Sequence, residues 1–140
     1  MSKKIIILGL LIAAAVIGAI SWKIVYKKSA ISVSKGANAI EISMETLLSD
    51  FEANENSADG KYLGKVIQIK GIINSMDKND ERVSIYLVIP GYLSGVNCSF
   101  DAQVIDASKL KPGQEVTVKG VCTGYLLDVI MNRCILVQKK

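Results

Sequence analysis

The strongest constraint on the fold is a series of five short β-type segments, separated from one another by turn-forming residues. Alternation is clearest in the second segment, where Val83, Ile85 and Leu87 share one face. The sequence predicts strands over Lys65 to Met76, Arg82 to Ile89, Val96 to Phe100, Glu115 to Cys122 and Val129 to Val137. Gly71 indicates a bulge or sharp bend in the first strand, which a small barrel needs if that strand is to pair with two neighbours.

Two helical segments accompany the strands. Apolar residues at helical spacing predict a helix from Ser43 to Ala58, with Ser43 as its N-cap and Asp59-Gly60 as its end. A short helix is expected from Ala102 to Leu110, with Asp101 as its N-cap. The order helix, three strands, helix, two strands favours a mainly β fold, a five-stranded Greek-key barrel of the OB type. A small β-sandwich is the structural alternative.

The N-terminal segment is a predicted membrane anchor. Ile5 to Ile20 is apolar throughout, and extended to Tyr26 it approaches the roughly 20 residues that a transmembrane helix needs. Trp22 and Tyr26 suit the headgroup layer, and the lysines around them can extend out of it. We therefore expect an anchor at residues 1–28 (transmembrane helix at about 5–26), a tether at 29–42 and an OB domain at 43–140.

A cleaved signal peptide is the alternative interpretation of this segment. Lys3 and Lys4 would form its positively charged start, but Val16-Ile17-Gly18-Ala19 is a poor cleavage site and no cysteine follows for lipidation. Lysines stand on both sides of the apolar stretch, so the positive-inside rule barely decides the orientation.

Charge is divided unevenly along the chain. The anchor holds five of the 17 basic residues and none of the 13 acidic ones, which leaves 12 basic and 13 acidic residues after Lys28, a net charge of −1. A domain that binds nucleic acid through its phosphates usually carries a basic excess. The distribution therefore makes nucleic acid the less favoured partner.

Short runs in the C-terminal part are similar to those of a known family. They are Leu47-Leu48, Phe51 to Asn54, Ala58-Asp59, Tyr62 to Lys65, Val96 to Phe100, Leu110 to Gly120, Cys122 to Gly124 and Cys134. Over about Met44 to Val137 the chain resembles the tRNA-anti-like family of bacterial OB-fold proteins, which are small exported proteins, often lipoproteins or single-span membrane proteins. The resemblance implies the OB fold and export, and implies no particular activity. Lipoprotein members carry an N-terminal lipid-attachment cysteine that this chain lacks, so its anchor would be a helix.

Three cysteines, Cys98, Cys122 and Cys134, lie in predicted strands. In an OB barrel the last strand runs beside the third and the fourth, so either of the first two cysteines could reach Cys134. A hairpin centred near Asp128 would place Cys122 opposite Cys134, which makes a Cys122–Cys134 disulfide the candidate, with Cys98 as a buried thiol. Such a bridge fits an exported domain and favours a C-terminal domain in the periplasm or outside. The alternative is three small core residues, because free cysteine packs well inside proteins.

No catalytic or metal-binding pattern stands out. The sequence has no histidine, no CxxC, no phosphate-binding glycine loop and no GxSxG, which disfavours zinc, thiol and serine chemistry. Asp50, Glu52, Glu55 and Asp59 are expected to form a solvated helix face rather than an acid–base pair. We therefore expect no enzymatic activity, no metal and no cofactor.

The candidate binding surface is the face of the second and third strands with its flanking loops, where OB barrels bind their ligands. The predicted contacts are Arg82, Ser84, Tyr86, Asn97, Ser99 and Tyr125. Tyr86 and Tyr125 could stack on bases, but acids at 77, 80 and 81 make the adjacent loop unlike the basic track of a single-strand binder. Alternatively, Tyr86 is an ordinary surface residue.

A protein or peptide ligand needs no basic track. For such a partner, Tyr125 to Leu127 could serve as an exposed apolar anchor, unless Leu126 folds inward. The sequence thus predicts a single-pass protein of the bacterial inner membrane, whose OB barrel is a non-enzymatic binding or scaffold module for an envelope protein or peptide. A single-stranded nucleic-acid or oligosaccharide binder is the alternative.

Overall fold

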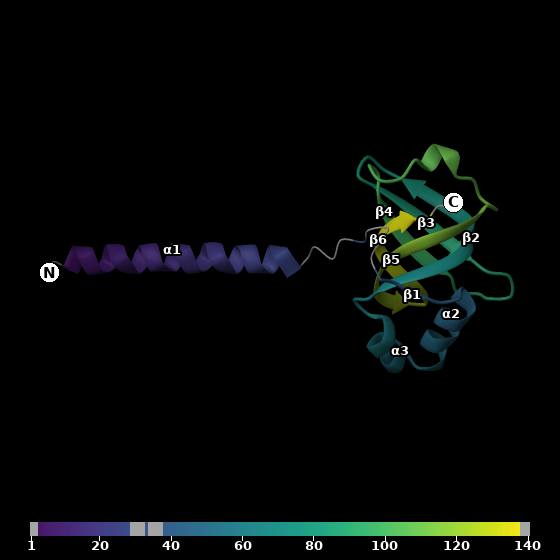
Figure 1. Ribbon diagram of the computed structural model, residues 1–140, viewed down its shortest axis with the longest axis horizontal. Coiled ribbons are helices and arrows are strands. Elements are labelled where there is room, and N and C mark those ends of the chain that lie inside the picture. The colour runs from purple at the N-terminus through teal and green to yellow at the C-terminus, as the bar shows by residue number, and fades with distance from the viewer. Residues whose placement is uncertain (1–2, 29–32, 34–37, 138–140) are drawn as a thin grey trace. The chain divides into compact units, whose positions relative to one another are not determined.

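The computed structural model describes residues 3–28, 33 and 38–137, which fall in two units, Met1–Ser32 and Val33–Lys140. The first unit contains helix α1 (Lys3–Lys28) (Figure 1). Its stretch Lys3–Ile20 has a mean hydropathy of 2.3 with none of the stretch buried. By length and composition α1 can therefore cross a membrane.

The second unit is a closed β-barrel with helices at one end (Figure 1). Its strands are β2 (Val66–Lys78), β3 (Arg82–Val88), β4 (Val96–Asp101), β5 (Glu115–Leu126) and β6 (Asp128–Leu136). They follow one another around the barrel in the order β2-β3-β4-β6-β5, and β5 closes on β2. Neighbours are antiparallel except β4 and β6, which are parallel. This is the predicted five-stranded OB topology, and the prediction is confirmed.

The barrel closes because β2 pairs with two neighbours, and it changes partner next to Gly71. The strand pairs with β5 from Val66 to Ile72 and with β3 from Ile72 to Lys78, so Gly71 lies where it changes partner. A Cβ at Gly71 would collide with Sδ of Met44 and lie 3.2 Å from Cβ of Leu87. The irregularity in β2 lies between Ile73 and Ser75 rather than at Gly71, where glycine instead permits close packing.

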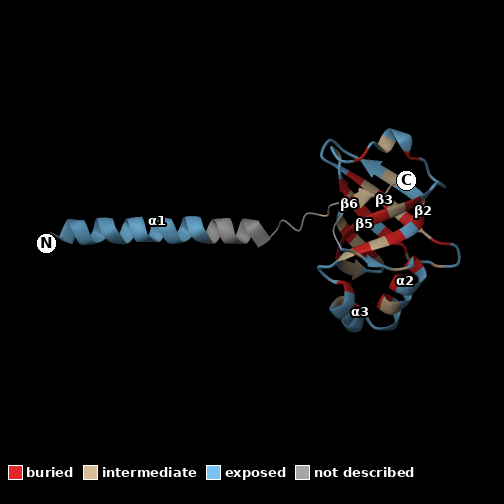
Figure 2. Cartoon of the chain, viewed as in Figure 1, coloured by how far each residue is buried: buried red, intermediate tan, exposed pale blue. Residues whose placement is uncertain are grey.

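One apolar core fills the barrel and continues under the helices. Val83, Ile85 and Leu87 are fully buried, as their alternation predicts, while their neighbours along β3 face outwards. The buried face of α2 (Met44–Ala53), with Leu47 and Phe51, closes the same end of the barrel as α3 (Glu55–Tyr62). Figure 2 shows the buried residues concentrated in the barrel strands and on the inner faces of these helices.

The predicted helix from Ser43 to Ala58 is in fact these two helices. Ser43 does cap the first, since its hydroxyl accepts a hydrogen bond from the N–H of Thr46. Asn54 then interrupts the helix with φ −161° and ψ 99°, and its side chain accepts the N–H of Ser57, which starts α3. Asp59-Gly60 lies inside α3. An asparagine that caps a new helix outweighed the apolar periodicity on which the prediction rested.

The second predicted helix, Ala102 to Leu110, is reduced to one 3₁₀ turn, η1 (Ala107–Lys109). Asp101 ends β4, and its carboxylate accepts the N–H of Gln103 in the following turn. Asp106 accepts the N–H of Ser108 and so caps η1. These local side-chain bonds compete with a continuous helix, which explains why the prediction was wrong.

The segment expected to be a tether ends in a strand. β1 (Ile40–Glu41) pairs in parallel with β2, and the N–H of Ile42 donates to the carbonyl of Gln68 at 3.1 Å. The barrel unit therefore includes residues before 43. Residues 29–32 and 34–37 of the expected tether lie outside the described residues.

Candidate binding site

Five of the six predicted contact residues lie together on the outer face of β3 and β4. Ser84 is opposite Ser99 and Tyr86 is opposite Asn97, while Arg82 is opposite Asp101. Their inward neighbours on both strands are buried, so register and alternation place the five on one surface. We call Arg82, Ser84, Tyr86, Asn97 and Ser99 the polar face.

The centre of the polar face has hydrogen-bonding capacity to offer. Within the part of the chain that the structure describes, the side chains of Ser84, Asn97 and Ser99 form no protein hydrogen bond. Hydroxyl and amide groups of this kind can both donate and accept. They suit a ligand that presents polar groups of its own, such as a peptide backbone.

One end of the polar face is acidic. The β2–β3 turn is held by Asn79, whose side-chain oxygen accepts the N–H groups of Glu81 (3.0 Å) and Arg82 (2.8 Å). Around this turn four carboxylates face two cations. They are Asp77, Asp80, Glu81 and Asp101, against Lys78 and Arg82, and we call this group the acidic end.

At the other end, Tyr86 is fixed by Asp128. The Tyr86 hydroxyl donates to Oδ1 of Asp128 at 2.8 Å, and the same oxygen accepts the N–H of Gly95 at 2.8 Å. Burial, followed by this bond and the charge of Asp128, raises the pKa of Tyr86. A Cβ at Gly95 would lie 2.7 Å from the Tyr86 ring, so the loop before β4 can approach only as glycine. Tyr86 is thus held in place by Asp128 and Gly95, and its ring is half-buried.

Tyr125 lies on β5, which pairs with β2 and β6 rather than with the strands of the polar face. Its ring stacks on Phe51 of α2, with centroids 5.1 Å apart and planes 17° apart, so one side of the ring is covered. Burial raises the pKa of Tyr125, and the nearby carboxylates of Glu52, Asp128 and Glu55 add to the effect. Tyr86 and Tyr125 therefore do not form a pair of rings that are both free to stack on a ligand.

The β5–β6 hairpin tip, Leu126 to Asp128, is the feature that sequence analysis only half recognised. Leu126 and Leu127 are 78% and 83% exposed, and Leu127 has a φ of 66°, a left-handed conformation unusual for leucine. The alternative in which Leu126 folds inward is wrong. Residues 123–128, which the prediction left between two strands, instead extend the strands into a tight hairpin in which Leu127 alone separates them.

The register expected for the cysteines is also wrong. Cys122 lies opposite Met131, because the hairpin is centred on Leu127 rather than near Asp128 and an irregularity between Cys122 and Gly124 shifts β5 by one further residue. The three cysteines are free and buried, and the thiol near Cys134 is that of Cys98. Their hydrogen bond, with burial, holds the pKa of Cys98 well above its usual value, and burial raises that of Cys122. Cys98 and Cys122 therefore favour the unreactive thiol form.

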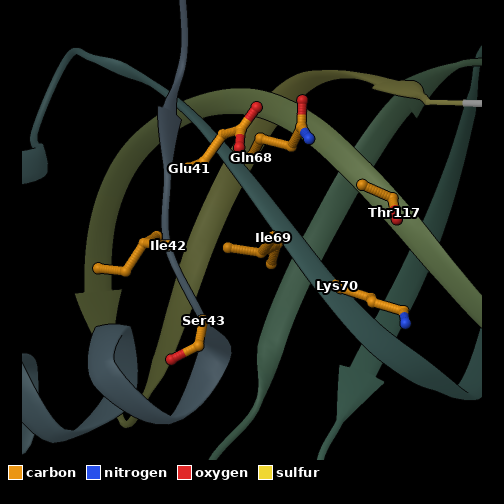
Figure 3. A pocket seen from close by; sticks show the side chains of 7 residues that line it. All are labelled: Glu41, Ile42, Ser43, Gln68, Ile69, Lys70 and Thr117. Carbon is orange, nitrogen blue, oxygen red and sulfur yellow. The ribbon is translucent and has the colours of Figure 1, made fainter.

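No other arrangement in the described residues suggests chemistry. Among them, no group of three His, Cys, Asp or Glu residues could hold a metal ion. A shallow hollow of about 360 Å³ lies between β1, β2 and β5, away from the polar face. Figure 3 shows its lining residues, Glu41, Ile42, Ser43, Gln68, Ile69, Lys70 and Thr117. Its cation, Lys70, already pairs with Glu115 at 2.7 Å.

Comparison with solved structures shows the same fold. A lipoprotein from Klebsiella pneumoniae, to which nucleic-acid binding has been attributed, superposes with a TM-score of 0.62 at 16% identity, over 71% of this chain and 92% of that one. The Stn1–Ten1 complex of S. pombe gives a TM-score of 0.41 at 20% identity, over 53% of this chain and 59% of that one. An asparaginyl-tRNA synthetase of Entamoeba histolytica gives 0.48 at 12% identity, over 74% of this chain and 24% of that one.

No curated protein matches the chain. The model of the tRNA_anti-like family, however, matches residues 1–136, which span α1 and the whole barrel. The resemblance seen in the sequence is thereby confirmed, and this chain is a member of the tRNA_anti-like family.

Proposed function

We propose that the barrel is a non-enzymatic binding module, held at the bacterial inner membrane by α1 and exposed to the periplasm or the outside, whose polar face binds a protein or peptide segment. The observation that carries the proposal is the character of that face. Its centre offers unpaired hydroxyl and amide groups, and one end carries four carboxylates against two cations.

The charge at the acidic end of the polar face favours a polypeptide ligand over nucleic acid. Single-strand binders neutralise phosphates with a basic track and stack bases on free aromatic rings. Here the track is replaced by the acidic end, and Tyr125 has one ring side on Phe51. A polypeptide segment can pair its backbone amides with Ser84, Asn97 and Ser99 and place a basic side chain beside the acidic end.

The membrane role is supported by α1 and by the family. The apolar stretch of α1 is long enough to span a membrane, and the similar Klebsiella protein is described as a lipoprotein. An anchored barrel can reach only partners in the layer of the envelope next to the membrane. The local concentration of such a partner is set by the reach of the linking segment.

Single-stranded nucleic acid is the second candidate. It is supported by the binding attributed to the Klebsiella protein, which has the same fold, and by the half-buried ring of Tyr86 on the polar face. An oligosaccharide would use the same hydroxyl and amide groups. The acidic end favours neither of these over a polypeptide with basic residues.

Photo-crosslinking in intact cells tests the proposal. Ser99 is replaced by a photoreactive amino acid in the full chain, with Thr117, on the outer surface of β5, as the matched control position. We expect an adduct from Ser99 alone that is removed by protease and resists nuclease. A nuclease-sensitive adduct would establish the second candidate, and equal adducts from both positions would refute a role for the polar face.

Affinity for a labelled oligothymidine gives an independent reading. The proposal predicts weak binding that Arg82→Ala and Tyr86→Phe do not change. Tight binding that falls steeply with added salt and is lost in Arg82→Ala would instead show phosphate-driven recognition.

A further inference from the structure

The end of the barrel next to α2 carries three exposed leucines outside the polar face. Leu93 is fully exposed, and it stands with Leu126 and Leu127 at the same end, because Gly95 joins the two loops. The N–H of Gly95 donates to Asp128, and its carbonyl accepts the N–H of Val129 at 3.1 Å. We call Leu93, Leu126 and Leu127 the tip patch.

The tip patch is supported from below. The Ser94 hydroxyl donates to Oε1 of Glu52 at 2.6 Å, and the Tyr92 and Ser49 hydroxyls lie 3.3 Å apart, so α2 holds the loop that carries Leu93. Beneath the hairpin tip, Tyr125 stacks on Phe51. The leucines are thus presented by a braced scaffold.

Leu127 runs against the rules for a hairpin turn. A residue with φ near 66° is normally Gly, Asn or Asp, and a turn in water is normally polar. Leucine there strains the backbone and leaves an apolar side chain in solvent. Departures of this kind, where an otherwise regular fold breaks a local rule, concentrate at functional sites.

The charges around the tip patch indicate what covers it. Three carboxylates lie near the tip patch: Asp128 belongs to the hairpin and accepts the N–H of Gly95, Glu52 accepts the hydroxyl of Ser94 beside Leu93, and Glu55 acts with them on Tyr125. Phospholipid surfaces in cells commonly carry negative charge, so these carboxylates oppose membrane insertion of the tip. They would likewise oppose a second copy of the same patch, whereas they attract a segment that combines apolar and basic side chains.

We propose that the tip patch docks a basic amphipathic segment of a partner protein, with apolar side chains on Leu93, Leu126 and Leu127 and basic side chains on Glu52 and Glu55. The site is distinct from the polar face and does not depend on it. Leucines at its centre with carboxylates at its rim match the general arrangement of interfaces, an apolar core inside a polar border.

A peptide-binding experiment tests the proposal. The full chain is reconstituted in phosphatidylcholine nanodiscs and titrated with a synthetic amphipathic helix of leucine and lysine that carries a photoreactive leucine. We expect crosslinks at residues 90–95 and 126–128. Affinity should fall at least tenfold in Leu126→Ser/Leu127→Asn and remain unchanged in Val104→Ser, which removes an exposed apolar side chain far from the tip. Unchanged affinity in the tip variant would overturn the proposal.

Charge and position are tested with the same assay. Glu52→Gln/Glu55→Gln should weaken binding and flatten its salt dependence, and a peptide with glutamate in place of lysine should bind at least tenfold more weakly. Loss of binding in Asn97→Ala/Ser99→Ala with no effect of the tip variant would place the peptide on the polar face and overturn the tip assignment. In that case the proposed function would stand.

The two rival occupants give distinct signals. Leu127→Trp, in a chain that also carries Trp22→Phe, reports contact of the tip with lipid. Quenching of its fluorescence by brominated lipid would overturn the proposal in favour of the membrane. A photoreactive residue at position 127 that joins two copies of the chain would overturn it in favour of self-association.

Discussion

The β2–β3 turn and the β5–β6 turn lie at opposite ends of the same barrel and are built on opposite principles. In the first, Asn79 accepts two backbone N–H groups and every residue of the turn is polar and exposed. In the second, a leucine occupies a left-handed position and two leucines face solvent. One turn follows from what the chain needs in order to fold. The other carries strain and exposed apolar surface that folding does not require, which directs attention to binding.

The largest expected effect is at the carboxylate that ties the second turn to the barrel. Asp128→Ala removes the acceptor of both Tyr86 and Gly95 and should lower the free energy of unfolding by about 2–3 kcal/mol. Urea unfolding of the full chain in mild detergent measures this. Asp80→Ala, at the first turn, is the matched control and should stay within about 0.5 kcal/mol of the parent. Equal losses of stability in Asp128→Ala and Asp80→Ala would show that the two turns do not differ in what they contribute to the fold.

Tyr86→Phe should cost about 1.5 kcal/mol, since it removes a hydrogen bond to a carboxylate while keeping the ring. It also changes the response to alkali. The pKa of Tyr86 is raised above 10.0 in the fold, so its stabilising contribution is complete below pH 10 and is lost as the pH rises through the folded-state pKa.

A second tyrosine, Tyr62, also has a raised pKa, about 12, because it is buried and its hydroxyl donates to Asp50 at 2.7 Å. Tyr62 is present in both the parent and Tyr86→Phe, so the difference between their pH profiles reports on Tyr86 alone. Above pH 10 the parent should lose more stability than Tyr86→Phe. Unfolding curves collected from pH 8 upward check this, and parallel losses in both proteins would mean that Tyr86 does not hold its proton.

At the first turn, Asn79→Ala should cost about 1 kcal/mol, because two backbone N–H groups lose their acceptor but remain within reach of water. Asn79→Asp keeps an acceptor oxygen and should restore most of the loss. Thermal unfolding of the parent, Asn79→Ala and Asn79→Asp measures these differences in stability. A neutral Asn79→Ala would show that this turn is held by its strands rather than by its own side chain.

The smallest effect has the opposite sign. Leu127→Asn should stabilise the barrel by about 0.5–1 kcal/mol, because asparagine tolerates positive φ and prefers water. Leu126→Asn, at a residue without positive φ, is the control for exposure alone and should be close to neutral. If Leu127→Asn lowers the stability of the barrel, Leu127 makes stabilising contacts in the folded chain. Its positive φ would then be no indication of a binding role.

Much of the barrel follows from short-range patterns. The alternation of Val83, Ile85 and Leu87 predicted the buried face of β3, and Gly71 marked the place where β2 changes partner, since both are local consequences of side-chain size and direction. The polar face followed from the same alternation on two paired strands. Residues 82, 84 and 86 have to meet 101, 99 and 97 once the register is set.

The failures involve contacts that no local pattern reports. Asn54 divides the first helix through a bond to Ser57, and a hairpin centred on Leu127, with one irregularity next to Cys122, places Cys122 opposite Met131 rather than Cys134. Tyr125 was grouped with the polar face, although its ring stacks on Phe51 from a segment far away in sequence. Register shifts and long-range packing are decided by the whole core, which explains why the sequence predicted the outward residues of β3 and β4 better than the register and contacts around them.

The two-residue strand β1 gives the domain a mechanical property. Tension that travels along the chain from α1 reaches the parallel pairing of Ile40 and Ile67 and the bond from Ile42 to Gln68 before it reaches the five-stranded barrel. Because β1 contributes only two residues to the sheet, we expect it to detach at a lower force than the barrel strands. Its release would free residues 38–42, roughly 17 Å at full extension. The attachment can therefore lengthen under load, and shorten again when the load is removed, while the binding domain stays folded.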